Sequence, residues 1–321
     1  MPTNFGFIDI LNITGPIFII ISIGYLAVKY EIFTKSNVRS LGLFVINFAL
    51  PALLFKAVSD KDIETIFNLT YFLSYGIGSL LAFSLIFFII RKGGSSVEKS
   101  AIAGMGSSFS NTGFVGYPII LSYLGSEALV GVALSMILEN IILFPVVLAI
   151  AEHAASGEKK FFPALIKAIN NLIKNPIVIA IALGITFSIF KVSLPEPATK
   201  VISMFASASG AIALFAIGGV LVGLELKGMI KKISLVTFGK LVIHPLMVFL
   251  VICLLPPFDR VLQVVAVVLA CMPMMSIYPI MGQKYGEEDN CAASLLLATV
   301  ASFFTITFVI WILNNYYWVS K

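Results

Sequence analysis

Ten apolar stretches of about 20 residues each fill most of this 321-residue chain, with short polar connections between them. A helix of about 20 residues spans the hydrocarbon core of a bilayer. Because that layer holds no water, a spanning segment has to satisfy its own backbone hydrogen bonds, which an α-helix does. The sequence therefore predicts an all-α membrane protein with ten transmembrane helices. We place the spans at about residues 7–28, 38–57, 68–90, 101–124, 128–151, 171–190, 200–224, 233–255, 261–283 and 291–317.

The charge content excludes other classes of protein and predicts an orientation. Charged residues make up 12% of the chain, about half the fraction that soluble domains carry. A soluble enzyme and a nucleic-acid-binding protein are therefore excluded, and membrane lipids are the expected surroundings. With both termini outside, the inside connections hold 14 Lys and Arg residues and the outside segments hold six. Because basic residues collect on the cytoplasmic side, we expect both termini to lie outside.

Two pairs of similar segments lie half a chain apart. Residues 16–24 (PIFIIISIG) match residues 176–184 (PIVIAIALG), and residues 117–127 match residues 278–288 at nearly the same offset. Each half then holds five spans, and an odd number of spans inverts the second half in the membrane. Inverted repeats are typical of secondary transporters. The predicted domains are a first five-helix repeat, a short cytoplasmic linker and an inverted second five-helix repeat: residues 1–152, 153–170 and 171–321.

The fourth and ninth spans contain residues that interrupt a helix. Residues 104–118 read GMGSSFSNTGFVGYP, and residues 271–279 read CMPMMSIYP. Glycine weakens a helix, and proline removes a hydrogen bond and crowds the preceding turn. Backbone groups freed in this way must be buried in protein or line a watery cavity. Breaks at matching places in two halves point to a transporter's substrate site, although two kinked, tightly packed helices would give the same pattern.

Asn111 is the strongest candidate for contact with a substrate. Its amide lies at the first break and can donate to an anion or accept from a cation's water. A half-helix that begins at the break adds free N–H groups and a partial positive charge suited to a carboxylate. The alternative role of Asn111 is to satisfy backbone carbonyls that the break leaves free. The full set of predicted substrate-binding residues is Asn111, Thr112, Gly113, Gly116, Pro118, Asn47, Ser276 and Tyr278.

Three ionisable residues lie deep inside predicted spans, where charge is costly and usually functional. Glu139, in span five, is either a proton or cation site or the structural partner of a basic side chain. Lys240 and His244 lie four residues apart on one face of span eight. A neighbouring ammonium group disfavours a metal, so structural pairing, with Glu139 as a partner, is favoured there. The sequence contains no metal-ligand spacing and no nucleophile–base motif. We therefore expect no resident metal and no cofactor, and we do not expect the protein to be an enzyme.

With these motifs in view, the chain resembles the bacterial branch of the auxin efflux carrier family over essentially its whole length. The resemblance depends on residues 111–118 (NTGFVGYP), supported by residues 50–55 (LPALLF), 240–245 (KLVIHP) and 273–279 with the following Tyr285 and Gly286. It implies two inverted five-helix repeats, similar to bile acid–sodium symporters. Broken helices four and nine would cross at prolines. These crossover prolines are Pro118 and either Pro273 or Pro279.

The resemblance also implies a mechanism and a class of substrate. Spans 1, 2, 6 and 7 would form a scaffold, and spans 3–5 and 8–10 a transport domain that moves like an elevator, often in a homodimer. The implied substrates are small organic anions, auxin in plants and dicarboxylates such as malate or malonate in bacteria, carried across the cytoplasmic (inner) membrane. Plant members have a large loop between the halves, whereas residues 152–170 are short here, which argues against auxin and loop-based regulation.

Two other functions fit the same sequence. One is a sodium-coupled symporter of the bile-acid carrier type, so that the coupling ion stays open between H⁺ and Na⁺. The other is a membrane ligand sensor that moves nothing, against which the absence of a soluble output domain counts.

Overall fold

The structure, a computed structural model, describes residues 7–59, 61, 68–156, 174–226 and 228–317. Within these ranges every named element is a helix, and the only β-type pairing is an isolated bridge. Seven helices are long and apolar enough to cross a membrane, and three shorter apolar helices accompany them. The prediction of an all-helical membrane protein is therefore confirmed. Most of the predicted linker, residues 157–170, lies outside the described residues.

The helical elements follow one another with short connections. In chain order they are α1 (Phe7–Lys29), α2 (Lys35–Phe44), η1 (Val45–Ala49), α3 (Leu50–Ser59), α5 (Leu69–Lys92), α6 (Val97–Ser108), η2 (Thr112–Gly116), α7 (Tyr117–Leu124), η3 (Ser126–Ala128), α8 (Leu129–Ile137), η4 (Leu138–Leu143), α9 (Phe144–Ser156), α11 (Pro176–Phe190), α12 (Glu196–Val220), α13 (Ile230–Phe238), η5 (Gly239–Ile243), α14 (His244–Leu254), α15 (Arg260–Ala270), α16 (Tyr278–Gln283), α17 (Glu288–Ile312) and η6 (Leu313–Tyr317).

Polar residues begin several of these apolar helices. Thr34 starts α2 with a capping box, in which Thr34 and Asn37 each accept the other's backbone N–H through a side-chain oxygen. Asn68, Asn175 and Asp259 each accept a backbone N–H from the first turn of α5, α11 and α15. Such caps satisfy donors that the first turn leaves open. The helix starts are therefore fixed by local polar residues, although the helices themselves are apolar.

Among the described residues, four spans widen into a π-helical turn that ends two residues before a proline. The turns are η1, η2, η4 and η5, and the prolines that follow are Pro51, Pro118, Pro145 and Pro245. Proline has no N–H and its ring crowds the carbonyl four residues earlier, so the helix widens to accommodate it. A wider turn also rotates the side chains on either side of it. Glu139 and Lys240 lie in two of these turns, η4 and η5.

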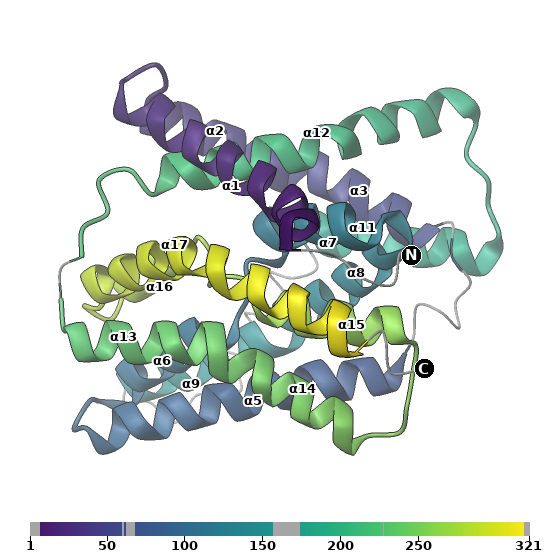
Figure 1. Ribbon diagram of the computed structural model, residues 1–321. Coiled ribbons are helices and arrows are strands. Elements are labelled where there is room, and N and C mark those ends of the chain that lie inside the picture. The colour runs from purple at the N-terminus through teal and green to yellow at the C-terminus, as the bar shows by residue number, and fades with distance from the viewer. Residues whose placement is uncertain (1–6, 60, 62–67, 157–173, 227, 318–321) are drawn as a thin grey trace.

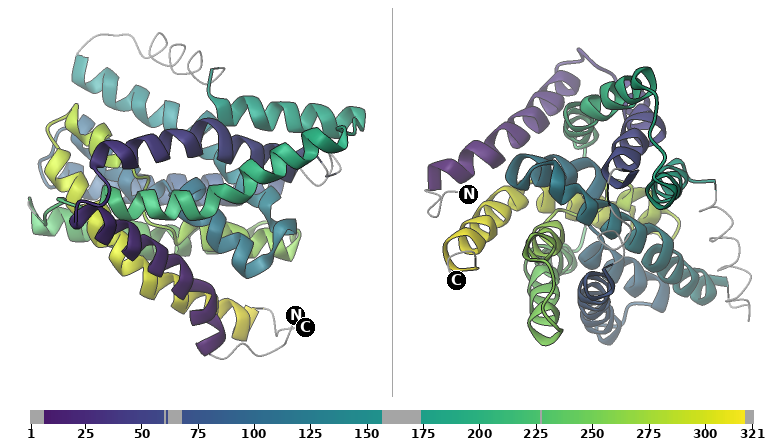
Figure 2. Two further views of the ribbon diagram at one scale, coloured as in Figure 1. Left: turned by 90° about the horizontal axis from the view of Figure 1, so that it is seen from above. Right: turned by 90° about the vertical axis from the view of Figure 1, so that its right-hand side faces the viewer.

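The helices form two groups that face each other (Figures 1 and 2). The first group contains α1, α2, α3, α11 and α12, which pack on one another. The second contains α5, α6, α9, α13, α14 and α15, and α7, α8 and α17 lie between the groups, in contact with α1 or α3 (Figure 1). Close backbone contact holds the first group together: a Cβ at Gly218 would lie 1.9 Å from the Ile21 carbonyl oxygen. Small residues at such crossings are how membrane helices approach closely.

One end of the molecule carries a buried cluster of charged and polar side chains. The α1–α2, α5–α6 and α12–α13 connections lie at one end, on the left of Figure 1. At the start of α13 and of α17, Lys232 donates to Glu287 at 2.7 Å, and Asn290 donates to the same carboxylate at 2.8 Å. Burial alone would raise the pKa of Glu287, but the bonds from Lys232 and Asn290 hold it below its usual value. We call these three residues the end cluster.

Candidate functional site

Two non-helical segments cross near the centre of the second group of helices. One runs over residues 109–111, between α6 and η2, and the other over residues 271–277, between α15 and α16. Ser110 and Met274 form an antiparallel bridge, and the Asn111 N–H donates to the Pro273 carbonyl at 2.8 Å. Each segment thereby supplies the partners that the other lost by leaving the helix, as backbone in a membrane requires.

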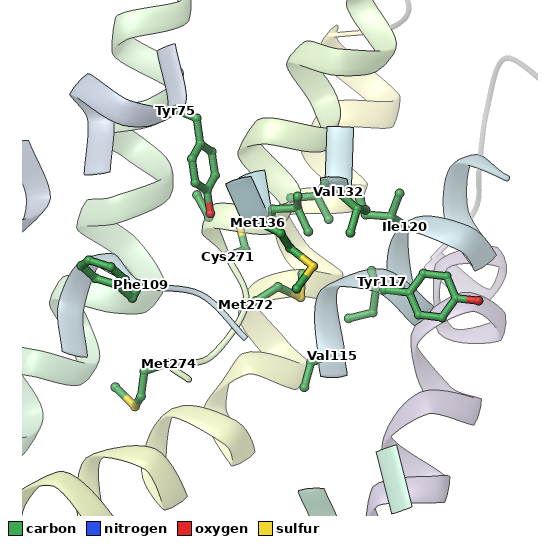
Figure 3. Close-up of a cluster of buried hydrophobic side chains, with 14 of the residues drawn as sticks. Tyr75, Phe109, Val115, Tyr117, Ile120, Val132, Met136, Cys271, Met272 and Met274 are labelled. Atoms are coloured by element: carbon green, nitrogen blue, oxygen red, sulfur yellow. The ribbon is translucent and has the colours of Figure 1, made fainter. Parts of the chain in front are cut away.

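Buried apolar side chains surround this crossing (Figure 3). Phe109 and Met274 extend from the two crossing segments, and Met136 and Met272 lie close together beside them (Figure 3). Tyr75 reaches the crossing from α5 with its hydroxyl directed towards it (Figure 3). The polar groups of the crossing are therefore enclosed in an apolar shell and have to find their partners within the protein.

The Asn111 backbone is fully used, whereas its side chain is not. Its carbonyl accepts from the N–H groups of Val115 at 3.0 Å and Gly116 at 2.9 Å, which starts the η2 turn. The side-chain amide has no hydrogen-bond partner among the described residues, although Asn111 is only 5% exposed. The Asn111 amide is thus engaged by no backbone carbonyl of the described residues and stays available for a ligand.

A cavity of about 200 Å³ lies between this crossing and the first group of helices. At about 30 Å³ per water, it holds roughly six or seven waters. Asn111, Thr112, Gly113, Ser276 and Glu139, all predicted from the sequence, are among its lining residues. The wall on the side of the first group comes from η1, α3 and α11. It consists of Ile46, Leu50, Asn175 and Ile177.

Glu139 accepts three hydrogen bonds at the rear of the cavity. The Tyr75 hydroxyl donates to it at 2.6 Å, the Thr112 hydroxyl at 2.8 Å and the Ser110 N–H at 3.2 Å. Only 2% of Glu139 is exposed. Three donors offset much of the cost of burying a carboxylate, so Glu139 ties α5, the crossing and η4 together.

Lys240 is completely buried and uses all three of its N–H donors. It donates to the Ser110 hydroxyl at 2.9 Å, to the Ala270 carbonyl at 2.7 Å and to His244 Nδ1 at 2.8 Å. An ammonium group cannot accept, so Nδ1 of His244 is the acceptor. The proton of a neutral His244 ring then lies on Nε2, which donates to the Ser79 hydroxyl at 2.8 Å. The two basic residues thus contact each other, whereas the partner expected from the sequence was Glu139.

Ser110 joins the two charges of this site. Its N–H donates to Glu139 and its hydroxyl accepts from Lys240, and within the described residues no direct ion pair links Glu139 with Lys240. We call Tyr75, Ser79, Ser110, Glu139, Lys240 and His244 the crossing network. It connects α5, η4, η5, the start of α14 and the first crossing segment with the last residue of α15, Ala270, and so holds Asn111 in its place.

The remaining predicted residues lie away from the cavity lining. Asn47 is exposed, and its amide donates to the Leu43 carbonyl in the same helix at 2.8 Å. Gly116 packs against α15, where an added Cβ would lie 2.6 Å from Leu269. The Tyr278 ring packs so closely on α6 that a Cβ at Gly106 would lie 2.3 Å from it. Gly116 therefore packs η2 against α15, and Tyr278 packs α16 against α6.

The crossover differs from its expected position at the prolines. Pro273 belongs to the paired backbone, but Pro118 and Pro279 are the second residues of α7 and α16. Both lie after the crossing because proline fits the first turn of a helix, where its missing N–H would have no partner. The first-half partner of Pro273 is Asn111, so the crossing comes before Pro118 in the chain.

Sequence reasoning missed several polar residues of the site. Asn140 and Asn175 line the cavity, and Tyr75 and Ser79 complete the crossing network. Tyr75 and Ser79 lie four residues apart on one face of α5, which is a usable signal. Asn175 was hidden by its role as a helix cap, since its side-chain oxygen accepts the Ile177 N–H at 2.9 Å.

The arrangement can hold a small anion. The Asn111 amide and the Ser276 hydroxyl can donate into the cavity, and the continuous helix of η2 and α7 begins there with its N-terminal end. Helix N-termini favour negative charge. Among the described residues, no three His, Cys, Asp or Glu side chains are grouped to hold a metal. The site therefore offers neutral donors and a helix dipole to a ligand.

Known proteins resemble this chain over most of its length. The pattern of the family described as "Membrane transport protein" matches residues 14–310. A "Putative malonate transporter" of Rhizobium meliloti (strain 1021) is 29% identical over 96% of this chain and 97% of its own. An uncharacterized transporter of Escherichia coli (strain K12) is 27% identical over 74% of this chain and 76% of its own.

A third relative is named for signalling. It is the "Lysosomal cholesterol signaling protein" of Mus musculus, 27% identical over 73% of this chain and 28% of its own. The family and the transporter names among the relatives point to a transporter and not to an enzyme. With its apolar helices, the chain belongs to the membrane transport protein family, the auxin efflux carrier family that its motifs resemble.

Proposed function

We propose that this protein is a secondary transporter of small organic anions, dicarboxylates such as malonate or malate, in the cytoplasmic membrane of a bacterium, with both termini outside. The observation that carries the proposal is the Asn111 amide, which is buried, lacks a protein partner and lines a cavity at the crossing of two broken spans. A relative named for malonate transport that covers nearly the whole chain supports the same class of substrate.

The size and polarity of the cavity favour a small acid. Ligand pockets for larger molecules have volumes of roughly 300–1,000 Å³, whereas this cavity has about 200 Å³. A dicarboxylate of a few carbons fits such a volume better than an indole ring does. Asn111 and Ser276 donate from the two crossing segments, so that one carboxylate bridges both halves of the chain. The apolar wall of Ile46, Leu50 and Ile177 closes the other side.

The two helix groups support an elevator mechanism. The first group corresponds to spans 1, 2, 6 and 7, the proposed scaffold, and the remaining spans form the proposed transport domain. The two halves of the chain are inverted five-helix repeats in this proposal, with spans four and nine broken at the crossing. The cavity lies at the boundary between the groups, with lining residues from both. Sliding the transport domain along the scaffold would carry the bound anion across the membrane.

The crossing network travels with the transport domain in this mechanism. Its charges are satisfied internally, so they do not have to separate when the domain moves. The substrate's negative charge is then met by Asn111, Ser276 and helix N-termini. The coupling ion is either H⁺, through Glu139 or His244, or Na⁺, as in bile-acid carriers. Replacing sodium by choline would stop uptake that is coupled to Na⁺. Collapsing the pH gradient would stop uptake that is coupled to H⁺.

Counterflow of radiolabelled malonate in proteoliposomes tests the proposal. We expect the wild type to exchange malonate and Asn111→Ala to lose at least tenfold in rate, equivalent to about 1.4 kcal/mol at the site. Asn12→Ala is the matched control, since Asn12 is exposed on α1 and far from the crossing in the chain. Undiminished exchange by Asn111→Ala would remove Asn111 from the mechanism, and no exchange of any dicarboxylate by the wild type would contradict the proposal.

A second function, sensing without transport, is favoured by the mouse relative named for signalling. This chain matches 28% of that protein, so the signalling named for the whole relative is a proposal for this chain. Saturable malonate binding to the purified protein, without flux under any imposed gradient, would support sensing over transport.

A further inference from the structure

A second cavity, of about 560 Å³, opens at the boundary between the two helix groups, near the C-terminal end of α3. It is lined by α3, α7, η3 and α12. Leu50 of α3 lines the small cavity and Lys56 lines the large one. Six residues of helix separate these positions by about 9 Å along the axis. Leu53, which is buried, lies between them and lines the larger cavity. The two cavities therefore follow one another along the same boundary.

Lys56 brings an unbalanced positive charge to this outer cavity. Its Nζ donates to the Ser203 hydroxyl of α12 at 2.9 Å, and among the described residues no carboxylate pairs with it. The other lysine of the lining, Lys61, is paired with Glu127 of η3. The described lining thus carries two ammonium groups and one carboxylate. At the opposite end of the molecule, by contrast, Lys232 and Lys284 each have a carboxylate partner.

Hydroxyl groups lie beside the Lys56 ammonium group. Ser203 and Ser207 lie one turn apart on the same face of α12, and both line the cavity. The Tyr117 hydroxyl, directed away from the buried cluster in Figure 3, belongs to the same lining. The Ser207 hydroxyl donates to the Ser203 carbonyl at 2.8 Å, so the donors that remain are the Lys56 ammonium group and the hydroxyls of Ser203 and Tyr117. Such a set suits a carboxylate or a comparable small anion. No such set of cationic and hydroxyl donors lines the small cavity.

We propose that this outer cavity is a second anion site, where a small dicarboxylate binds before it reaches the crossing. The inference extends the proposed transport function by adding a docking site with Lys56 as its cation. A cation in a low-dielectric recess raises the local concentration of anions. Lys56 therefore recruits the substrate, and Asn111 receives it in the smaller cavity, whose described lining holds no basic residue.

Protection of a cysteine from labelling tests this site without requiring transport. Ser207→Cys places a thiol in the outer cavity, in a Cys253→Ser background that removes the exposed native cysteine; the other two, Cys271 and Cys291, are buried. The purified protein is labelled with a neutral maleimide at constant ionic strength, with malonate or chloride. At a malonate concentration of ten times its Kd, we expect labelling to slow about tenfold, because about one site in eleven stays free.

Substitutions identify which group causes the protection. Lys56→Gln should abolish it and Lys56→Arg should retain it, because only the charge is needed. Lys200→Gln is the matched control, since this exposed lysine of α12 pairs with Glu196 and does not line the cavity. Asn111→Ala should leave protection intact. Equal labelling with malonate and chloride, or protection that survives Lys56→Gln, would overturn the inference.

The same experiment separates this inference from the proposed function. Protection that depends on Lys56, in a protein that exchanges no dicarboxylate in vesicles, keeps the anion site and contradicts transport. Protection that Asn111→Ala removes and Lys56→Gln does not would assign the effect to the small cavity and overturn the outer site.

Discussion

The crossing network and the end cluster both bury a lysine and a glutamate, but they satisfy these charges in different ways. In the end cluster, Lys232 meets Glu287 directly at 2.7 Å. In the crossing network, Ser110 stands between Lys240 and Glu139, and each charge is satisfied by several neutral groups. A direct pair tolerates small displacements near water. A network of many exact partners in an apolar shell does not, and it therefore fixes the shape of the crossing.

The largest effect is expected at Lys240. Lys240→Met removes three hydrogen bonds, leaves their buried acceptors without a donor, and takes away the positive charge that Ser110 links to Glu139. The expected cost is about 3–5 kcal/mol of unfolding free energy. Thermal unfolding in detergent should show a large fall in Tm, and adding Glu139→Gln should recover part of it, because the two sites are coupled. A Tm for Lys240→Met within a degree of the wild type would show that the crossing network is not structural.

A smaller loss is expected at Ser110. Ser110→Ala keeps the N–H that serves Glu139 but removes the hydroxyl that accepts from Lys240, so one buried donor loses its partner. The expected cost is about 1–3 kcal/mol, measured by the same unfolding assay. Ser108→Ala is the control, because its hydroxyl bonds only to the Gly104 carbonyl in its own helix. If the two substitutions lowered the unfolding free energy equally, Ser110 would not be the residue that links Lys240 with Glu139.

At Glu287 the comparison predicts a pH dependence. The pKa of this carboxyl is lowered in the folded protein. Its contribution to stability is therefore complete at a pH above the ordinary glutamate pKa, and it is lost as the pH falls through the lowered pKa of the folded state. Wild-type stability should therefore fall in acid more steeply than that of Glu287→Gln. At neutral pH, Glu287→Gln should cost less than half of what Lys240→Met costs. Parallel curves for the two proteins below pH 5 would contradict this assignment.

The smallest effect is expected at Asn47. Its amide bonds only within its own helix and is exposed, so Asn47→Ala should change the unfolding free energy by no more than about 0.5 kcal/mol. Malonate exchange should also stay close to wild type. A loss comparable to that of Asn111→Ala would return Asn47 to the substrate site, where the sequence placed it.

The sequence predicts much of this architecture for clear physical reasons. Apolar length identifies membrane helices, and the clustered glycines and prolines of residues 104–118 and 271–279 locate the segments that leave the helix. Asn111, Thr112 and Ser276 could be found because polar residues at such a break have few other uses in lipid.

Other features of the site could not be predicted. Apolar helices look alike on the faces that meet lipid and protein, so nothing in the sequence shows that Tyr75 faces Glu139 or that Asn175 faces the cavity. The π-helical turns before the four prolines also rotate side chains away from the positions that a regular helix gives. The pairing of Asn111 with Pro273 depends on which free backbone groups meet in space, which spacing along the chain does not determine.

The contrast between neighbouring residues at the crossing gives the most direct test. Ser110 is held by protein partners, whereas the Asn111 side chain has none among the described residues, so Asn111 should matter for the ligand and not for the fold. The decisive measurement is the shift in Tm that malonate causes in Asn111→Ala, beside the wild type. For Asn111→Ala we predict the wild-type Tm in the absence of malonate. We also predict that at least ten times more malonate is needed to raise its Tm as much as in the wild type. If malonate raised the Tm of Asn111→Ala as much as it raises that of the wild type, the central claim that this amide binds the transported anion would be contradicted.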